Sequence, residues 1–188
     1  MTEKTTIRQA IVAAAGELIR TRGVQGMAIS ELIVASGTSA GAIYHHFPNR
    51  TAIVVEVART ALAWPLAALN DYRHRPASPS QLLGFAMVAL AASPELGELL
   101  TQLGAGAGTD DVLGQRLRAE FAILRDSVDE TMRAWAQRNG VPARAVQGYS
   151  QLLIGLTLGY ASQRSLVDHF DEATYRAQAF TTWALVGQ

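Results

Sequence analysis

Helix-start and helix-stop signals recur along the whole 188-residue chain, and they constrain its fold more than any other feature of the sequence. Thr6-Ile7-Arg8-Gln9 and Ser78-Pro79-Ser80-Gln81 both have the form of a capping box, in which the first and fourth residues satisfy each other's backbone N–H groups. Proline follows the cap in the second box and again in Ser93-Pro94-Glu95, where its fixed φ suits the first helical position. Strand signals are nearly absent. The sequence therefore predicts an all-α fold with about nine helices.

The same signals divide the chain into expected helices. In the N-terminal part these run from Thr6 to Gly23, from Met27 to Ser36, from about Ser39 to Phe47, and from a cap at Asn49 to about Arg75 with a kink at Pro65. In the rest of the chain they run from Ser78 to about Ala92, from Ser93 onward, from a cap at Thr109 to Gly140, from Pro142 to about Val167, and from Asp171 to Val186. The run Gly104-Ala105-Gly106-Ala107-Gly108 is expected to form a loop, because glycine is unfavourable inside a helix.

Composition excludes several classes of chemistry. The chain has no cysteine, so disulfides, thiolate metal sites and cysteine nucleophiles are ruled out. The polar N-terminus lacks the apolar core of a signal peptide, and charged or small residues interrupt the apolar stretches before they reach the length of a membrane span. We therefore expect a soluble, cytoplasmic protein that does not associate with a membrane.

The charges are balanced overall but distributed unevenly. Residues 1–75 contain eight Lys or Arg residues and five acidic residues, a formal charge of +3, whereas the remainder contains eight Arg and eleven acidic residues, a formal charge of −3. This modest asymmetry permits an anionic partner for the N-terminal part without requiring one.

Two of the expected short helices are separated by Gly37-Thr38-Ser39. A short helix, a glycine-containing turn and a second short helix have the layout of a helix-turn-helix. On the second helix, Ile43 and Phe47 are four residues apart and can be buried together, whereas the residues between them are directed more toward the exposed side. The first and fourth helices would supply the packing that this pair lacks.

The run GTSAGAIYHHFPNRTAI, residues 37–53, resembles the DNA-binding signature of TetR/AcrR-type transcriptional repressors. The family pattern is a glycine-led turn, a small-residue start, an aliphatic–Tyr–x–His–Phe core and a basic residue that opens the next helix. The matching positions are Gly37, Ser39, Gly41, Ile43, Tyr44, His46, Phe47 and Arg50. Upstream, Ile7, Ala14, Leu18 and Gly23 match the family's first helix. The chain departs from the pattern at Ala28, where a Ser or Thr cap is common, and at Ile33, where a small residue is usual.

The resemblance implies both a domain organisation and a set of partners. Residues 1–50 would form the helix-turn-helix DNA-binding domain, continuing into a linking helix at residues 49–75. Residues 51–188 would form an effector-binding and dimerisation bundle. Double-stranded DNA, a second copy of the chain and a small-molecule effector would be the partners, with no cofactor, no metal and no enzymatic activity.

The expected DNA contacts follow from the way a recognition helix enters the major groove, with its N-terminal residues nearest the base edges. Base contacts are expected from Ser39, Ala40, Ala42 and His45, and phosphate contacts from Thr38, Tyr44, His46 and Arg50, with Ser30 touching the backbone or a flanking base. Because these side chains offer few groups with which to read bases, we expect DNA shape and dimer spacing to supply much of the specificity.

Aromatic and methionine residues after residue 60 are more often plain core than ligand contacts, but the resemblance implies an effector pocket lined by such residues. The candidates are Trp64, Phe85, Met87, Phe121, Leu124, Tyr149 and Tyr160. The low charge of the central helices favours an apolar or weakly polar effector.

The last two helices are apolar around more of their circumference than one small core needs, and glycines in the first of them permit close helix approach. In the family, two such helices from each subunit form a four-helix interface. The interface candidates are Leu152, Gly155, Leu156, Gly159, Phe180 and Trp183. The alternative is that these are ordinary core helices.

Other kinds of site fit the sequence less well. Adjacent residues on a helix point about 100° apart, so His45 and His46 do not converge on a metal as an i, i+4 pair would. There is no G-x-S-x-G nucleophile motif, and the glycine-rich run after residue 103 has neither a preceding strand nor a following lysine. The expected function is a transcriptional repressor released from a pseudo-palindromic operator by a small, apolar effector. The open alternatives are activation in place of repression, a DNA-binding regulator without a small-molecule effector, and an all-α ligand-binding or enzymatic bundle.

Overall fold

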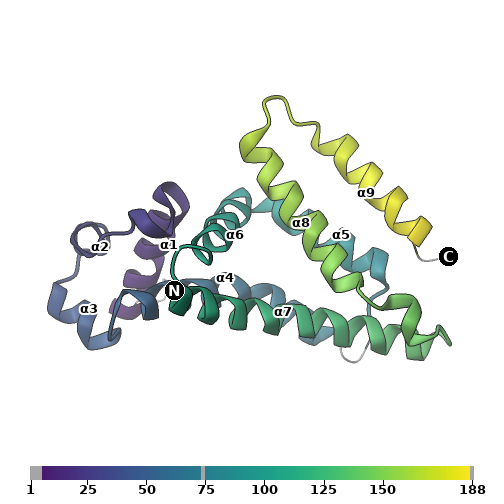
Figure 1. Cartoon of the computed structure of the whole chain (residues 1–188), viewed down its shortest axis with the longest axis horizontal. Coiled ribbons are helices and arrows are strands. Elements are labelled where there is room, and N and C mark those ends of the chain that lie inside the picture. The colour runs from purple at the N-terminus through teal and green to yellow at the C-terminus, as the bar shows by residue number, and fades with distance from the viewer. Residues whose placement is uncertain (1–5, 73–74, 187–188) are drawn as a thin grey trace, which may run out of the picture. The chain divides into compact units, whose positions relative to one another are not determined.

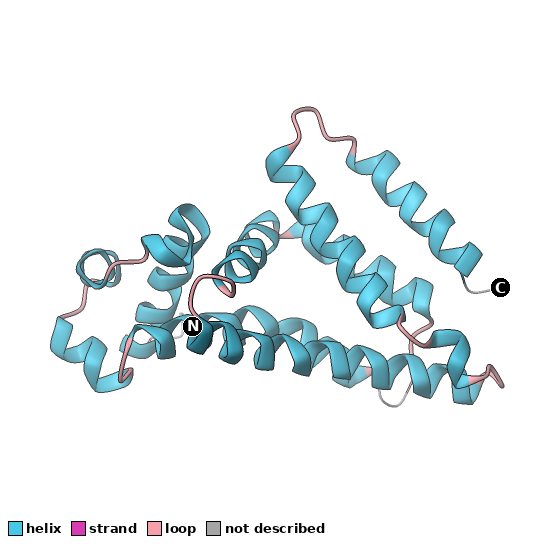
Figure 2. Ribbon diagram, in the orientation of Figure 1, coloured by secondary structure: helices cyan, strands magenta, loops and turns pink. Residues whose placement is uncertain are grey.

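The computed structural model describes residues 6–72 and 75–186, with side chains described up to residue 183. Within these ranges the regular structure is entirely helical (Figure 2), which confirms the expected all-α fold. The elements are α1 (Ile7–Gly26), α2 (Ile29–Ser36), α3 (Ala40–His46), α4 (Arg50–Asp71), α5 (Pro79–Ala92), α6 (Pro94–Gly106), α7 (Asp111–Arg138), the 3₁₀ helix η1 (Ala143–Val146), α8 (Tyr149–Leu166) and α9 (Glu172–Val186), labelled in Figure 1.

The chain divides into two compact units. Unit 1 comprises Met1–Leu62 and Leu99–Glu120, and unit 2 comprises Ala63–Glu98 and Phe121–Gln188. The helices α4, α6 and α7 therefore each begin in one unit and end in the other. The boundary between functional domains expected near residue 50 stays a prediction, because these units are defined by packing alone.

Local capping determines where the helices of unit 1 begin. The backbone N–H of Thr6 donates to Gln9 Oε1 at 2.8 Å and that of Gln9 donates to Thr6 Oγ1 at 3.2 Å, so the predicted capping box is present. Gly23 has a φ of 73°, which breaks the regular conformation of α1 at the expected position, although a further turn continues to Gly26. Asn49 caps α4 as expected, with its Oδ1 accepting from the Ala52 N–H at 2.9 Å.

The core of unit 1 joins helices that are distant in sequence. Ile11 on α1, Leu32 on α2 and Ile43 on α3 are fully buried, and so are Leu103 on α6 and Leu117 on α7. Burying a side chain of this size contributes about 1.5–3 kcal/mol. The segment at residues 99–120 therefore belongs to the packed interior that supports α1–α3.

The glycine-rich run at residues 104–108 is not wholly a loop, so that expectation is wrong for its first half. The helix α6 continues through Gly106 before a turn at residues 107–109. A Cβ atom on Gly106 would lie 2.7 Å from Val24 Cβ, so glycine permits the end of α6 to pack directly against the end of α1. This tertiary contact outweighs the low helix propensity of glycine, which costs about 1 kcal/mol per residue.

Two helix boundaries near residue 109 and residue 75 also differ from expectation. Asp110 caps α7 in place of Thr109, since the Leu113 N–H donates to Asp110 Oδ1 at 2.7 Å. The Thr109 hydroxyl is committed elsewhere, donating to the Gly106 carbonyl at 2.8 Å and accepting from Gln25 Nε2 at 2.7 Å. The helix α4 contains Pro65 and ends at Asp71, before the expected Arg75.

Unit 2 has its own core, formed mainly by side chains of α5, α7, α8 and α9, with Leu69 from α4 and Val146 from η1. The Ser78 capping box that starts α5 is present, with bonds of 2.8 and 3.2 Å. Gly140 adopts a φ of 69° after α7, as expected for a helix stop. The single helix expected from Pro142 to Val167 is wrong: η1 is followed by Gly148 at a φ of 82°, a conformation that favours glycine, and α8 begins only at Tyr149.

Among the described residues, α4 is long and apolar enough, by length and composition alone, to cross a membrane. The helices α5 and α6 reach this length only if the bent pair is counted as one span. The expectation that every apolar stretch falls short of this length therefore does not hold for α4, whose 18-residue window has a mean hydropathy of 1.6. The core helix of a soluble protein can have the same length and hydropathy. Burial of Ile53, Val54, Val57 and Leu62 accounts for much of the apolar character of α4.

Candidate nucleic-acid interface

The connection between α2 and α3 is a tight turn held by short-range hydrogen bonds. Gly37 ends α2 in the left-handed conformation, with a φ of 64°. The Ser36 hydroxyl bonds to the Leu32 carbonyl at 2.6 Å and to Thr38 Oγ1 at 2.8 Å. Ser39 then starts α3, its Oγ accepting from the Ala42 N–H at 3.1 Å. The predicted helix-turn-helix is confirmed.

One side of helix α3 is buried against unit 1, and the opposite side is exposed to solvent. Ile43 and Phe47 are 0% and 3% exposed, as their spacing predicts. Ala40, Gly41, Tyr44 and His45 are exposed, and their i, i+4 spacing places them on one face. Gly41 was not among the predicted contacts, although its position one turn before His45 places it on this exposed face.

The remaining predicted DNA contacts have distinct surroundings. Ser30 is exposed in the first turn of α2, whereas Thr38 and Ala42 are half-buried. The hydroxyl of Ser39 still has its proton to donate, because its cap bond uses the oxygen as acceptor. His46 is half-buried, and its ring meets that of His45 edge to face at 5.1 Å. Within the described part of the chain, no three metal-ligating side chains gather into a group.

Arg50 is directed into unit 1. Its Nε donates to the Met27 carbonyl at 3.1 Å, and its Nη2 donates to the Val24 carbonyl. These bonds tie the start of α4 to the end of α1 and to the segment that leads into α2. The phosphate contact expected of Arg50 stays a prediction, while its bonds in the structure are those of a clamp.

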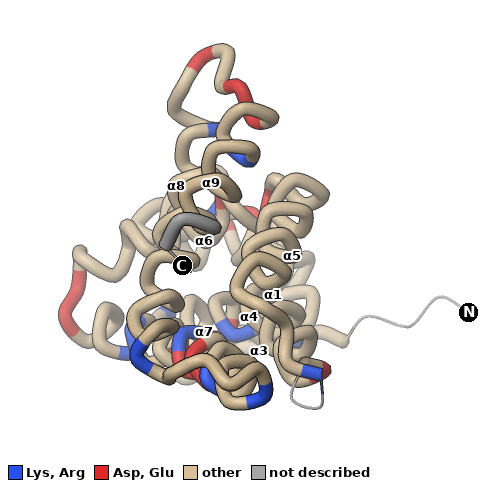
Figure 3. The backbone as a smooth tube through the Cα atoms, turned by 90° about the vertical axis from the view of Figure 1, so that its right-hand side faces the viewer, with Lys and Arg blue, Asp and Glu red and all other residues tan. Residues whose placement is uncertain are grey.

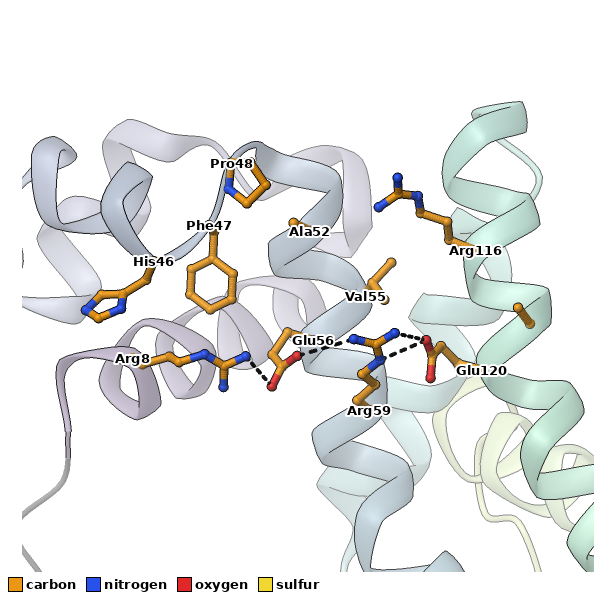
Figure 4. Close-up of a pocket in the computed structure, with 11 residues that line it drawn as sticks. Arg8, His46, Phe47, Pro48, Ala52, Val55, Glu56, Arg59, Arg116 and Glu120 are labelled. Carbon is orange, nitrogen blue, oxygen red and sulfur yellow. Dashed lines mark hydrogen bonds and ion pairs between the residues drawn. The ribbon is translucent and has the colours of Figure 1, made fainter.

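A chain of ion pairs, which we name the α1–α4–α7 network, joins Arg8, Glu56, Arg59 and Glu120 (Figure 4). It lies beside a cleft of about 420 Å³ that is also lined by His46 and the α3–α4 turn. The hydrogen bond and the charge of Glu120 raise the pKa of Arg59 above its ordinary value. Sequence reasoning missed this network, because its partners come from three helices and only the i, i+3 spacing of Glu56 and Arg59 is visible locally.

The seven predicted effector contacts fall into two groups in unit 2. Trp64 and Phe85 stack with ring centroids 5.1 Å apart and planes inclined by 22°, and Trp64 is half-exposed. Met87, Tyr149 and Tyr160 are buried in the core, Leu124 packs against it and Phe121 is half-buried. A separate cleft of about 200 Å³ is lined from α4 and α7 by Leu66, Leu69, Asn70, Ser127, Glu130, Thr131 and Ala134, none of which was predicted. The effector contacts stay predictions.

The predicted dimer contacts also divide by exposure. Leu152 and Phe180 are each 38% exposed, and Gly155 is exposed with nothing within 4 Å of its Cβ position. Leu156 and Gly159 are half-buried, and a Cβ on Gly159 would lie 3.1 Å from the Tyr175 hydroxyl. Trp183 is 2% exposed and its ring lies 5.2 Å from that of Tyr149. The prediction of an interface therefore depends chiefly on Leu152, Gly155 and Phe180.

These observations define a class of protein. A short helix with a bare outer face, held by a tight turn and two buried anchors, is the DNA-reading half of a helix-turn-helix. In this chain it is joined by continuous helices to a second helical unit.

Comparisons with known proteins show what this chain is similar to. Residues 11–57 match the family model for bacterial regulatory proteins of the tetR family. A putative TetR-family transcriptional regulator from Rhodococcus sp. has a similar fold, with a TM-score of 0.77, 17% identity, and coverage of 97% of this chain and 99% of that one. One from Mesorhizobium loti MAFF303099 has a TM-score of 0.69, 18% identity, and coverage of 96% and 94%.

A third solved structure was determined with a ligand. The transcriptional regulator FadR from Bacillus subtilis, in complex with stearoyl-CoA, has a TM-score of 0.73, 15% identity, and coverage of 93% of this chain and 96% of that one. A comparison with curated proteins finds no match. The resemblance to TetR-type transcriptional regulators is thus confirmed, by sequence over residues 11–57 and by fold over the rest of the chain.

Proposed function

We propose that this chain is a homodimeric transcriptional repressor that binds a pseudo-palindromic operator and is released from it by a small, apolar effector. The observation that carries the proposal is α3, whose anchors Ile43 and Phe47 are buried while Ala40, Gly41, Tyr44 and His45 remain exposed on one face. This face lies inside the segment that matches the tetR family model.

The exposed face of α3 suits close entry into a major groove with little base readout. Ala40 and Gly41 present almost no side chain, so the helix backbone can approach the base edges, with the Ser39 hydroxyl available as a donor. His45 is the best candidate on this face for a base contact with a long side chain, since Tyr44 is assigned to a phosphate. The limited direct readout assigns much of the specificity to DNA shape and to the separation of two half-sites, about 34–36 Å apart.

Phosphate contacts would hold α3 in register. The Tyr44 hydroxyl, the His46 ring and the Thr38 and Ser30 hydroxyls are the side-chain candidates, and the free N–H groups at the start of α4 add backbone donors. Arg50 would contribute mainly by fixing the start of α4, since its guanidinium already binds two carbonyls.

The exposed apolar residues of α8 and α9 would form the interface between two copies. Leu152 and Gly155 lie on one side of α8, and Phe180 is half-exposed on α9. Both helices carry few charged residues along their length (Figure 3), which favours burial against a partner. Two reading helices on one rigid dimer would match the symmetry of a pseudo-palindrome.

An apolar effector is supported by the composition of unit 2. Its helices contribute the stacked rings of Trp64 and Phe85. The core of the same unit also contains the buried side chains of Met87, Tyr149 and Tyr160. The FadR structure of similar fold holds stearoyl-CoA, a ligand with a long apolar chain. The helix α4 begins in unit 1 and contains Pro65 in unit 2, so a ligand that displaces α4 would alter the spacing of the two reading helices.

The decisive experiment is selection of bound sequences from random duplex DNA. The expected result is a pseudo-palindromic consensus, bound with an affinity that falls steeply as salt rises because phosphate contacts release counterions. Uniform binding of all sequences, or no binding at all, would contradict the proposal. Release of the selected duplex by long-chain acyl compounds, with chain-length dependence, would then test the effector.

A further inference from the structure

The α1–α4–α7 network is continuous from α7 to the anchor of the recognition helix. Glu120 Oε1 accepts from Arg59 Nε at 2.8 Å and lies 2.7 Å from Arg59 Nη2. Arg59 Nη1 lies 3.9 Å from Glu56 Oε2, and Glu56 Oε1 lies 2.7 Å from Arg8 Nη2. Figure 4 shows the four side chains in this order across one wall of the cleft.

The last member of the network touches α3 through an aromatic ring. The guanidinium carbon of Arg8 lies 5.2 Å from the centroid of the Phe47 ring, within the range of a cation–π contact. Phe47 ends α3, with its N–H donating to the Ile43 carbonyl at 2.9 Å, and its ring is buried. The position of Phe47 therefore determines how the C-terminal end of α3 is held against unit 1.

The two carboxylates are the members that most need their partners. The Glu120 side chain is 11% exposed and that of Glu56 is 19% exposed, whereas Arg8 and Arg59 are 47% and 59% exposed. A carboxylate withdrawn from water needs a cationic partner. Each arginine, in contrast, is exposed enough to solvent to change its orientation. The adjacent cleft of about 420 Å³ gives Arg59 room to change partners without repacking of the core.

We propose that Glu120 is a positioning residue for DNA recognition, acting through Arg59, Glu56 and Arg8 on Phe47 to fix the orientation of α3. Glu120, on α7, binds the side chain of Arg59 and so leaves Glu56 free to pair with Arg8. Without the Glu120 charge, Arg59 turns to Glu56, competes with Arg8, and weakens the contact on Phe47. This inference rests on the proposed DNA-binding function and extends the DNA-reading machinery to Glu120 on α7, more than 70 residues beyond the end of α3.

The test compares operator binding with non-specific binding in the Glu120→Gln variant. The expected result is a loss of affinity of about tenfold for the selected operator, a size typical of coupled ion-pair networks. Affinity for an unrelated duplex stays unchanged, because no phosphate contact is removed. The ratio of specific to non-specific affinity therefore falls, and the salt dependence of operator binding keeps its slope.

Matched variants separate positioning from general destabilisation. Glu17→Gln removes the Arg20–Glu17 ion pair of 2.6 Å on α1, which has no part in the network, and is expected to leave the ratio unchanged. Arg59→Gln removes the group that competes with Arg8 for Glu56, so the double variant Arg59→Gln with Glu120→Gln is expected to recover the specificity that Glu120→Gln alone loses. Arg8→Gln, at an exposed site in the first turn of α1, tests the network if Glu120→Gln does not fold.

The outcomes distinguish this inference from the proposed function. If wild-type protein selects an operator and both Glu120→Gln and Arg8→Gln, folded by circular dichroism, bind it as tightly as wild type, the positioning role is wrong and the regulator stands. A lowered melting temperature with unchanged affinity of the folded protein has the same meaning. If wild-type protein shows no sequence preference, the proposed function itself fails.

Discussion

Tyr44 and Arg50 occupy matching positions of the DNA-binding signature but have opposite surroundings in the structure. The Tyr44 side chain is 53% exposed, with its hydroxyl free to meet a phosphate. The Arg50 guanidinium is partly buried and donates to the Met27 and Val24 carbonyls. At the scale of the residue, the same signature therefore contains one group suited to DNA and one that holds the scaffold.

This difference predicts separable effects of two substitutions. Tyr44→Phe is expected to weaken binding of all duplexes about equally, without changing the melting temperature, because it removes only the proposed phosphate contact. Arg50→Ala is expected to lower the free energy of unfolding by about 1–3 kcal/mol, because it leaves carbonyl groups without their charged donor. Urea denaturation and salt-dependent binding titrations on both variants measure the two effects. Equal stability of Arg50→Ala and wild type would contradict the clamp.

At the scale of the element, local signals were sufficient for some helices and insufficient for others. The capping boxes at Thr6 and Ser78 and the anchors Ile43 and Phe47 depend on residues three or four apart, so the sequence alone predicts them. The continuation of α6 through Gly106 depends on Val24, and the break before α8 depends on a single positive φ at Gly148. Neither a distant packing contact nor a single backbone angle leaves a periodic signal in the sequence.

The candidate site divides in the same way. The buried and exposed faces of α3 follow from helical spacing, so the sequence alone predicts that Ile43 and Phe47 are buried and that Tyr44 and His45 are exposed. Arg50 finds its carbonyl partners 23 and 26 residues away, and Arg59 finds Glu120 at a separation of 61 residues. Such pairings require the fold. The stacking of Trp64 on Phe85 likewise joins α4 to α5 and could not be read from either helix.

The two glycines near the end of α6 give a paired prediction about stability. Gly104 has nothing within 4 Å of its Cβ position, so Gly104→Ala is expected to stabilise by up to about 1 kcal/mol through higher helix propensity. Gly106→Ala is expected to destabilise by about 1–3 kcal/mol, because the new methyl group would overlap Val24. Thermal or urea unfolding of both variants compares them directly. Similar shifts in both would show that α6 does not pack closely on α1.

The start of α9 carries a prediction about pH. Asp171 accepts from the Thr174 N–H at 2.9 Å and from its hydroxyl at 2.7 Å, and these hydrogen bonds lower the pKa of Asp171 below its ordinary value of 3.8. The charged cap therefore contributes stability above pH 3.8 that is lost as the pH falls through the lowered pKa. Asp171→Asn keeps a capping oxygen without the charge, so the stability of the variant should depend less steeply on pH below about 4. Melting temperatures of both proteins from pH 2 to pH 6 test this, and parallel curves would contradict it.

At the scale of the whole molecule, the proposed function depends on the association of two copies. A single α3 with few base-reading groups gives weak discrimination, whereas two copies held at a fixed separation add their contacts and impose the half-site spacing. The exposed part of α8 around Leu152 and Gly155 is the surface that the proposed function assigns to this association. Its small and apolar character favours close approach of a second helix.

Gly155→Arg tests this assignment with little risk to the fold of the subunit. Because Gly155 is exposed and nothing lies within 4 Å of its Cβ position, a single copy has room for the start of the new side chain, which would bring a bulky charge into the proposed interface. The variant is expected to sediment as a monomer at concentrations where wild type is a dimer, with an unchanged helical circular dichroism spectrum. Its operator affinity should fall at least a hundredfold, while binding to an isolated half-site should match that of wild type. Ile123→Arg provides the control, since Ile123 is 51% exposed on α7, a helix that contributes no residue to the proposed interface, and should leave both dimerisation and operator binding intact. A Gly155→Arg variant that remains dimeric would place the contact between copies elsewhere on the molecule, and with it the geometry that sets the spacing of the two recognition helices.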